Sequence, residues 1–249
     1  MRVLALDTTT RAGSVALVND DAVVEERAGD STRAHAERLP SEIQALLEDC
    51  GLSSADVDLF AVAAGPGSFT GLRIGIATQQ GLAFVHRRKM AGISALDALA
   101  HIAARDDRRG WIGAWMDARR RDVFSALYRV ADGKPFESSR LTTTEDAHVG
   151  DPAETMERWR RIVGNEPIVV IGDGAVAFSE TIRAASPRAS ILEPSPLAGA
   201  IGRLAVAQAR KGATVDPAAV MPLYVRRPDA EIDRERRARM AERPQEAPG

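Results

Sequence analysis

The sequence has few cysteines, few aromatic residues and little excess charge of either sign, and each shortage excludes a class of protein. The single cysteine, Cys50, rules out an internal disulfide bond and a zinc site built from cysteines. Only 4% of the residues are aromatic and the formal net charge is -2, which argues against a broad basic face that binds nucleic acid unaided. No apolar run approaches the roughly 20 residues that span a bilayer.

The remaining composition is typical of a globular protein with one large domain or two small ones. Apolar residues make up 45% of the 249 residues and charged residues 27%, which is sufficient for a buried core. The sequence begins with a strand-like run, residues 3–6, and shows no signal-peptide pattern. We therefore expect a cytoplasmic protein that does not contact a membrane.

The hydrophobic pattern predicts two related halves. Each half has a β-hairpin, then one or more helices, and a buried strand that runs into a glycine turn and another helix. Strands are expected at 3–7, 14–18, 22–27, 59–64, 111–117, 122–130 and 168–171, and helices at 34–50, 68–84, 95–104, 152–163 and within 194–209, with a short segment, 90–93, leading to the third helix. This order of elements predicts mixed sheets with helices packed on their faces. Two such halves across a cleft predict an α/β fold of the actin-like superfamily, which includes sugar kinases and heat-shock ATPases.

The charged stretch 105–110 is the best candidate for a domain boundary. We expect an N-terminal half over 1–108 and a smaller C-terminal half over 109–227, whose last helix is free to pack back on the first half. The tail 228–249 alternates acidic and basic residues, which predicts a solvated helix or a flexible end.

Two turns are candidates for a nucleotide site. The first turn holds Asp7, Thr8 and Thr9, where an actin-like ATPase cradles phosphate with backbone N–H groups and positions a metal with the aspartate. Threonines make this cradle bulkier than glycines would, and local side-chain bonds that close the hairpin are the alternative. The second turn is Gly172, Asp173 and Gly174 after a buried strand, which turn chemistry alone also explains.

A third feature that could serve function is the set of glycines at 67, 71 and 75. Their four-residue spacing predicts that they lie on one face of the following helix. Each glycine costs a helix up to ~1 kcal/mol relative to alanine, so the stripe needs a compensating contact. We favour close packing of another backbone over an anion at the helix start. The spacing leaves open whether that backbone belongs to this chain or to another, and the segment lacks the Gly-Lys-Ser/Thr of a Walker phosphate loop.

Neither a metal centre nor a serine nucleophile is indicated. The four histidines lack the i+3 or i+4 spacing of a helical metal site, and no Gly-x-Ser-x-Gly elbow occurs. His35 begins an amphipathic helix and is expected at the helix start or on the surface. We therefore expect no metal ligands and no catalytic residues.

Several stretches in order resemble the bacterial TsaB family, formerly called YeaZ, over roughly residues 1–226. Gly-Pro-Gly-Ser-Phe-Thr-Gly within 65–75 is the most specific of them. The others are 4–9 with 14–17, His35 with Leu39 and Pro40, 81–83, 116–120, 172–174 and 222–226.

The resemblance implies a non-catalytic dimerisation or scaffold subunit of the complex that makes threonylcarbamoyladenosine beside the tRNA anticodon. Its partners would be a catalytic paralogue of the same fold, TsaD, and an ATPase, TsaE. The chain would pair with itself when alone and would meet tRNA only within the complex. The metal-binding histidines of TsaD fall on Ala95 and Leu99 here, which cannot ligate a metal. The resemblance therefore implies a degenerate active site that requires no cofactor and binds ATP or ADP weakly or vestigially, if at all.

The resemblance also implies a bundle of helices shared with TsaD or with a second TsaB. We assign to or beside that interface His35, Leu39, Gly67, Gly71, Leu72, Gly75 and Ile76. The alternative is an active ATP-binding enzyme of the actin-like superfamily, either an ATPase or a glycopeptidase-like hydrolase. A sugar kinase fits less well, because the chain is short for one.

Overall fold

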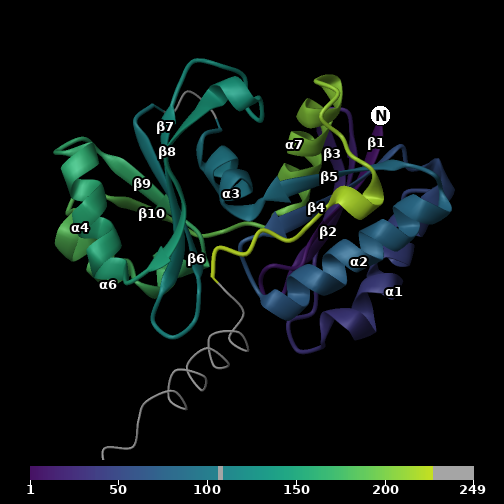
Figure 1. Cartoon of the computed structure of the whole chain (residues 1–249), viewed down its shortest axis with the longest axis horizontal. Coiled ribbons are helices and arrows are strands. Elements are labelled where there is room, and N and C mark those ends of the chain that lie inside the picture. Colours follow the sequence, from purple (N-terminus) through teal and green to yellow (C-terminus); the bar gives the residue numbers. More distant parts are fainter. Residues whose placement is uncertain (106–108, 227–249) are drawn as a thin grey trace, which may run out of the picture.

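The computed structural model describes residues 1–105 and 109–226, which form two lobes, each built on a five-stranded sheet (Figure 1). The expected tail 228–249 lies outside the described residues. Among the residues described, no helix has the length and apolar character required to cross a membrane.

The first sheet has the strand order β3-β2-β1-β4-β5. The strands β1 (Arg2–Asp7), β2 (Ser14–Asn19) and β3 (Ala22–Ala28) are antiparallel, whereas β4 (Leu59–Gly65) and β5 (Lys89–Ser94) run parallel to β1. The helices of this part are α1 (His35–Asp49), α2 (Phe69–Val85) and α3 (Ala95–Ala103).

The second sheet repeats this topology in the order β10-β9-β6-β7-β8. Its strands are β6 (Trp111–Asp117), β7 (Val123–Val130), β8 (Leu141–Gly150), β9 (Ile168–Ile171) and β10 (Ser190–Leu192). The helices are α4 (Pro152–Val163), α5 (Asp173–Ala177), α6 (Ser179–Ala185) and α7 (Ala198–Arg210). Because β6 occupies the place of β1, the turns after these two strands are equivalent in the two domains.

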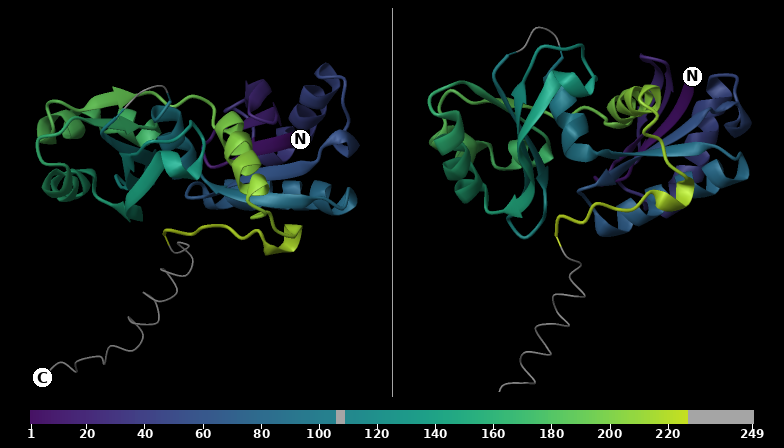
Figure 2. Two further views of the ribbon diagram at one scale, coloured as in Figure 1. Left: turned by 90° about the horizontal axis from the view of Figure 1, so that it is seen from above. Right: turned by 45° about the horizontal axis from the view of Figure 1, so that its top comes forward.

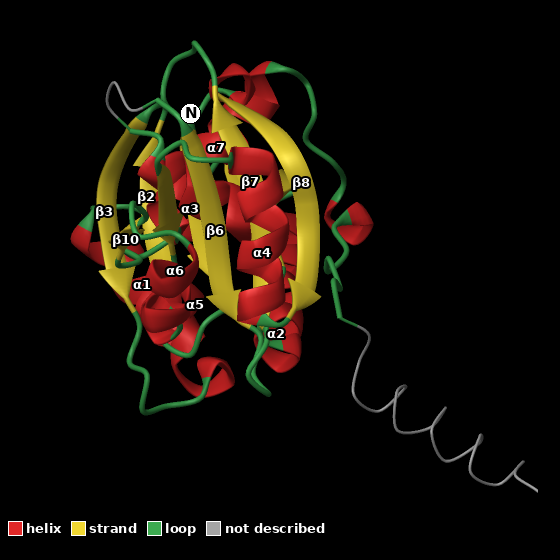
Figure 3. Ribbon diagram, turned by 90° about the vertical axis from the view of Figure 1, so that its left-hand side faces the viewer, coloured by secondary structure: helices red, strands yellow, loops and turns green. Residues whose placement is uncertain are grey.

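The alternation of side chains along β1 divides the core into layers. Leu4 and Leu6 pack towards α1 and α2, while Val3 and Ala5 face the opposite side, where α3 and α7 lie. Helices α4 and α6 cover the outer face of the second sheet (Figure 3). The cluster around α3 continues from the first sheet to the second, so the two domains share one apolar core.

The last helix, α7, packs on the first sheet rather than on the second (Figure 2). Its first turn is capped by strands far away in the sequence. The Ser14 hydroxyl accepts from the N–H groups of Leu197 and Ala198 at 3.2 and 3.0 Å, and a Glu26 carboxylate oxygen accepts from Gly199 N at 2.7 Å. The helix therefore belongs to the N-terminal domain in space.

The segment after α7 returns along the first domain and ends at the second. It pairs with β5 through Val215 and Met90, and Leu223 N donates to Ala64 O at 2.7 Å. Further along, the guanidinium of Arg226 donates to Ala118 O at 2.6 Å, in the turn after β6. This C-terminal segment, residues 213–226, therefore connects the two domains at the mouth of the cleft between them.

Candidate functional site

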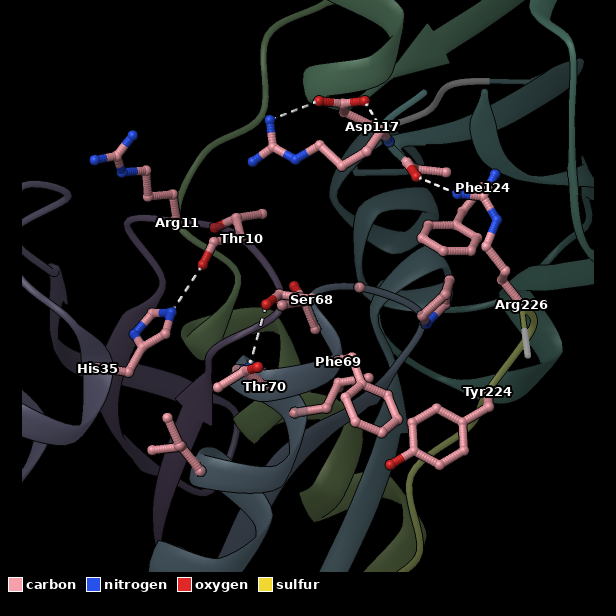
Figure 4. A pocket seen from close by; sticks show the side chains of 18 of the residues that line it. Thr10, Arg11, His35, Ser68, Phe69, Thr70, Asp117, Phe124, Tyr224 and Arg226 are labelled. Atoms are coloured by element: carbon pink, nitrogen blue, oxygen red, sulfur yellow. Dashed lines mark hydrogen bonds and ion pairs between the residues drawn. The ribbon is translucent and has the colours of Figure 1, made fainter. Parts of the chain in front are cut away.

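A cleft of about 630 Å³ lies between the domains, a size typical of small-molecule sites. Five segments and Phe124 of β7 line it: the turn after β1, residues 31–35, the start of α2, the turn after β6 and the C-terminal segment. Figure 4 shows His35 and Arg11 on one side of this space, Phe124 and Arg226 on the other, and Ser68 and Phe69 between them.

Asp7 ends β1 and is buried at the base of the first turn. Its Oδ1 accepts hydrogen bonds from Thr9 N at 2.8 Å and from Thr9 Oγ1 at 2.6 Å. Burial raises the pKa of the Asp7 carboxyl above its usual value, although the two bonds from Thr9 act in the opposite direction. One carboxylate oxygen, Oδ1, is therefore bound from within the turn.

The start of α1 is hydrogen-bonded to the same turn. His35 Nδ1 lies 2.8 Å from a guanidinium nitrogen of Arg38, which can only donate, so Nδ1 is the acceptor. Nε2 therefore carries the proton and donates to Thr10 O at 3.0 Å. Burial lowers the pKa of His35, in agreement with a neutral ring. Arg38 is itself buried, donates to Ala12 O and pairs with Glu42 at 2.5 Å.

The glycine stripe packs against this turn and not against another chain. A β-carbon on Gly71 would lie 2.0 Å from Thr8 O, and one on Gly75 would lie 2.2 Å from Thr8 Oγ1. One on Gly67 would lie 2.5 Å from Cβ of Thr9. Gly67 also precedes the helix, since Ser68 is the N-cap and accepts from Gly71 N at 3.2 Å.

The structure gives these glycines an internal packing role, and the assignment of this set to or beside an interface stays a prediction. The glycines give room to the chain's own first turn, which is one of the alternatives that the spacing left open. Leu39, Leu72 and Ile76 are buried in the N-terminal domain, whereas His35 and Gly67 are half-exposed in the cleft. A partner that docks on α2 must use its other face.

The second glycine turn likewise packs against its own domain. A β-carbon on Gly172 would lie 1.9 Å from Trp115 O, and one on Gly174 would lie 2.9 Å from the Met116 carbonyl carbon. Asp173 Oδ1 accepts from Asp117 N at 3.0 Å and from Gly174 N at 2.9 Å. The glycines therefore allow the turn to approach β6, and burial raises the pKa of Asp173.

The six residues expected to bind a nucleotide mainly contact their own chain. Asp7 and Asp173 lie near enough for Asp173 to add a small upward shift to the pKa of Asp7. However, Thr9 is the one member of the set among the residues that line the cleft. Both Thr9 donors are used by Asp7, and the space at the glycines is filled by the chain itself. These residues do not fit the phosphates of ATP.

The positions of the TsaD histidines are apolar and buried. Ala95 begins α3 and Leu99 follows one turn later, both within the shared core. Leu99 Cδ1 lies 3.2 Å from the place of a β-carbon on Gly172, so its side chain packs against the turn after β9. Within residues 1–105 and 109–226, no three His, Cys, Asp or Glu side chains are grouped so that they could hold a metal ion.

Two surfaces of the structure were not foreseen from the sequence. Arginines gather at the cleft from segments far apart in the chain: Arg11, Arg33, Arg119, Arg120 and Arg226. The exposed side of α2 carries a second set at the helical spacing of one face: Ala77, Gly81, Phe84 and Val85. For the arginines of the cleft, the sequence contains one local signal, the Arg-Arg-Arg sequence 119–121. For α2, the glycine spacing indicated the opposite, buried side of the helix.

The repeated hairpin-and-crossover topology, with the two equivalent turns facing one cleft, defines an actin-like protein of the class that includes sugar kinases and heat-shock ATPases. Residues 28–233 match the family model described as TsaD, the tRNA N6-adenosine threonylcarbamoyltransferase. The chain belongs to the TsaB, or YeaZ, family within this class.

Individual relatives support this membership. The chain is 31% identical over 232 residues to the tRNA threonylcarbamoyladenosine biosynthesis protein TsaB of Haemophilus influenzae, an alignment that covers 91% of this chain and 94% of that protein. It is 41% identical to TsaB of Escherichia coli over 129 residues, so that alignment spans about half of each protein, 52% and 55%. The solved structure of YeaZ from Pseudomonas aeruginosa covers 90% of this chain and 99% of its own at 28% identity, with a TM-score of 0.72.

Proposed function

We propose that this chain is a non-catalytic subunit that supports a TsaD-like catalytic paralogue in the formation of threonylcarbamoyladenosine on tRNA. Membership of the TsaB family supports a role in this pathway. The apolar side chains of Ala95 and Leu99, which are buried in the shared core, support the non-catalytic part. Hydrocarbon side chains offer no nitrogen, oxygen or sulfur donor to a metal.

The exposed face of α2 is the proposed docking surface for that paralogue, and Gly81 is the observation that carries it. Gly81 lies inside the helix, yet nothing lies within 4 Å of a β-carbon added there. The glycine therefore lacks the internal packing role of Gly75. Its neighbours on this face include Phe84 and Val85, which are 79% and 71% exposed. A glycine beside exposed apolar side chains lets a second helix approach closely.

A partner of related fold suits this face. The family model that matches residues 28–233 is that of TsaD itself, so the proposed partner shares the architecture of this chain. Two related chains can pair through equivalent helices in a nearly twofold arrangement. In the absence of the paralogue, the same face would pair with a second copy. A TsaE-like ATPase would join the complex, and we propose that this chain needs no nucleotide of its own.

The docking proposal is tested by two variants of α2 and one control. Phe84→Asp, which places a carboxylate in an apolar contact, and Gly81→Leu, which overpacks it, should each weaken binding of the TsaD-like paralogue, measured by calorimetry, about 10-fold to 100-fold, a loss of about 1–3 kcal/mol. Ile162→Asp changes another exposed apolar residue, on α4 of the other domain, and should leave the affinity unchanged. Melting temperatures should stay near that of the unsubstituted chain. Equal affinities for all four proteins would refute the assignment.

The competing proposal, an active ATPase or hydrolase, predicts turnover by the isolated chain. We expect the purified chain alone neither to hydrolyse ATP nor to modify tRNA. Robust hydrolysis that is lost in Asp7→Asn would favour the enzyme instead.

A further inference from the structure

The cleft concentrates positive charge in a chain that is slightly acidic overall. Five arginines line it, and Asp117 is the one carboxylate among the described residues of the lining. The lining therefore carries four more positive than negative charges, whereas the whole chain has a formal net charge of -2. Such a focused field attracts anions to one place rather than to a broad face.

Part of this charge is paired and part is not. The Asp117 carboxylate accepts from Arg119 N at 2.8 Å and lies 3.2 Å from the Arg119 guanidinium, and Arg226 pairs with Asp122. Arg11, by contrast, is oriented by a neutral group, since its Nε donates to Ser31 O at 2.8 Å. A carbonyl positions a guanidinium without neutralising it, so the charge of Arg11 is available to an anion.

The turn after β6 holds its arginines in an unfavourable backbone conformation. Arg119, Arg120 and Arg121 all have positive φ, at 62, 54 and 67°. The left-handed region costs a non-glycine residue roughly 1–2 kcal/mol. Arg119 and Arg120 both line the cleft. Strain of this kind is common where a turn presents side chains to a ligand.

The positive charge is spread over both walls of the cleft. The cations come from both domains, with Arg11 and Arg33 on the first and Arg119 and Arg120 on the second. Of the two turns considered for a nucleotide, Thr9 is the one expected residue that reaches the lining of the cleft. Aromatic rings lie beside the cations, with Phe69 stacked on Tyr224 at 5.0 Å and Arg226 5.9 Å from the ring of Phe124 (Figure 4). Basic grooves edged by aromatic rings are typical of sites for single-stranded nucleic acid.

We infer that the cleft binds the phosphodiester groups of a single-stranded RNA segment. This inference rests on the proposed function, because the complex supplies the RNA. A site with so few cations binds weakly by itself, since each phosphate contact adds only a modest, salt-dependent term. The free chain therefore binds RNA more weakly than micromolar at physiological salt, and the cleft acts within the complex.

The test uses the full chain and a fluorescein-labelled single-stranded RNA of about 12 nucleotides, followed by anisotropy over a range of low salt concentrations. The double variant Arg11→Gln/Arg33→Gln should weaken binding about 10-fold. It should also reduce the slope of log affinity against log salt by about 1.4, which is about 0.7 for each lost contact. The matched control Arg160→Gln/Arg161→Gln removes two exposed arginines from α4 and should change neither quantity.

Two competitors distinguish other occupants. ATP should displace the RNA only in large excess, and polyglutamate should displace it poorly at the same concentration of charges. ATP that binds more tightly than the RNA would show a nucleotide site, and displacement by polyglutamate would show a site for an acidic protein segment. Either result overturns the inference, as does undetectable RNA binding at low salt or equal loss in the control. Binding of the TsaD-like paralogue, measured on the same proteins, reports separately on the proposed function.

Discussion

Replacing Gly75 and Gly81 by alanine gives a matched comparison, because both glycines lie within α2 and both substitutions gain about 1 kcal/mol of helix propensity. The two positions differ in what the new methyl group meets. On Gly75 it would lie 2.2 Å from Oγ1 and 3.2 Å from Cβ of Thr8, which is fully buried and has little room to move. On Gly81 it would meet nothing within 4 Å.

Overpacking of this kind costs about 1–3 kcal/mol, so Gly75→Ala should be between neutral and about 2 kcal/mol less stable than the unsubstituted chain. Gly81→Ala should be about 1 kcal/mol more stable. In a chain of this length, 1 kcal/mol corresponds to about 2–4 °C in melting temperature. Thermal melts of the two variants should therefore differ by at least about 2 °C. Equal melting temperatures would refute the conclusion that the glycine stripe serves the chain's own packing.

Two pH-dependent predictions follow from buried titratable groups. Burial raises the pKa of Asp7, so the native state favours the protonated carboxyl, and stability falls as the pH rises from 3.8 through the raised pKa. Asp7→Asn keeps the acceptor for Thr9, so denaturation curves should show it gaining stability relative to the unsubstituted chain as the pH rises. Burial, with Arg140 nearby, lowers the pKa of His101 to about 4, so stability should fall as the pH drops from 6.5 towards 4. His101→Phe, which keeps the stacking on Phe136, should remove that loss of stability. If the free energy of unfolding fell equally steeply with decreasing pH in both proteins, this prediction would be contradicted.

The sequence predicted the buried parts of the fold well. Strand β9, for example, was expected at its observed bounds, because it is a short apolar run bounded by turn residues. Strand β8 was missed, since most of its side chains are polar, none is buried, and it lies at a sheet edge. Its hydrogen bonds to β7 depend on the neighbouring strand and leave no pattern in its own residues.

The sites were harder to predict than the elements, because they depend on contacts between distant residues. The glycine spacing correctly indicated close packing, but only the structure shows that Thr8 is the neighbour. The cap of α7 joins Ser14 and Glu26 to residues more than 170 positions later, which no local signal indicates. Likewise, the arginines of the cleft come together only when the turns after β1 and β6 face each other.

Reconstituted tRNA modification tests the central claim most directly. The assay would combine tRNA, a source of threonylcarbamoyl-adenylate, the TsaD-like paralogue and the TsaE-like ATPase, with the unsubstituted chain, Asp7→Asn, Phe84→Asp or no added chain. We predict that modification requires the chain, is retained by Asp7→Asn and is reduced by Phe84→Asp in proportion to its lost affinity for the paralogue. Full modification without the chain would contradict the account, as would its loss in Asp7→Asn when the complex still forms.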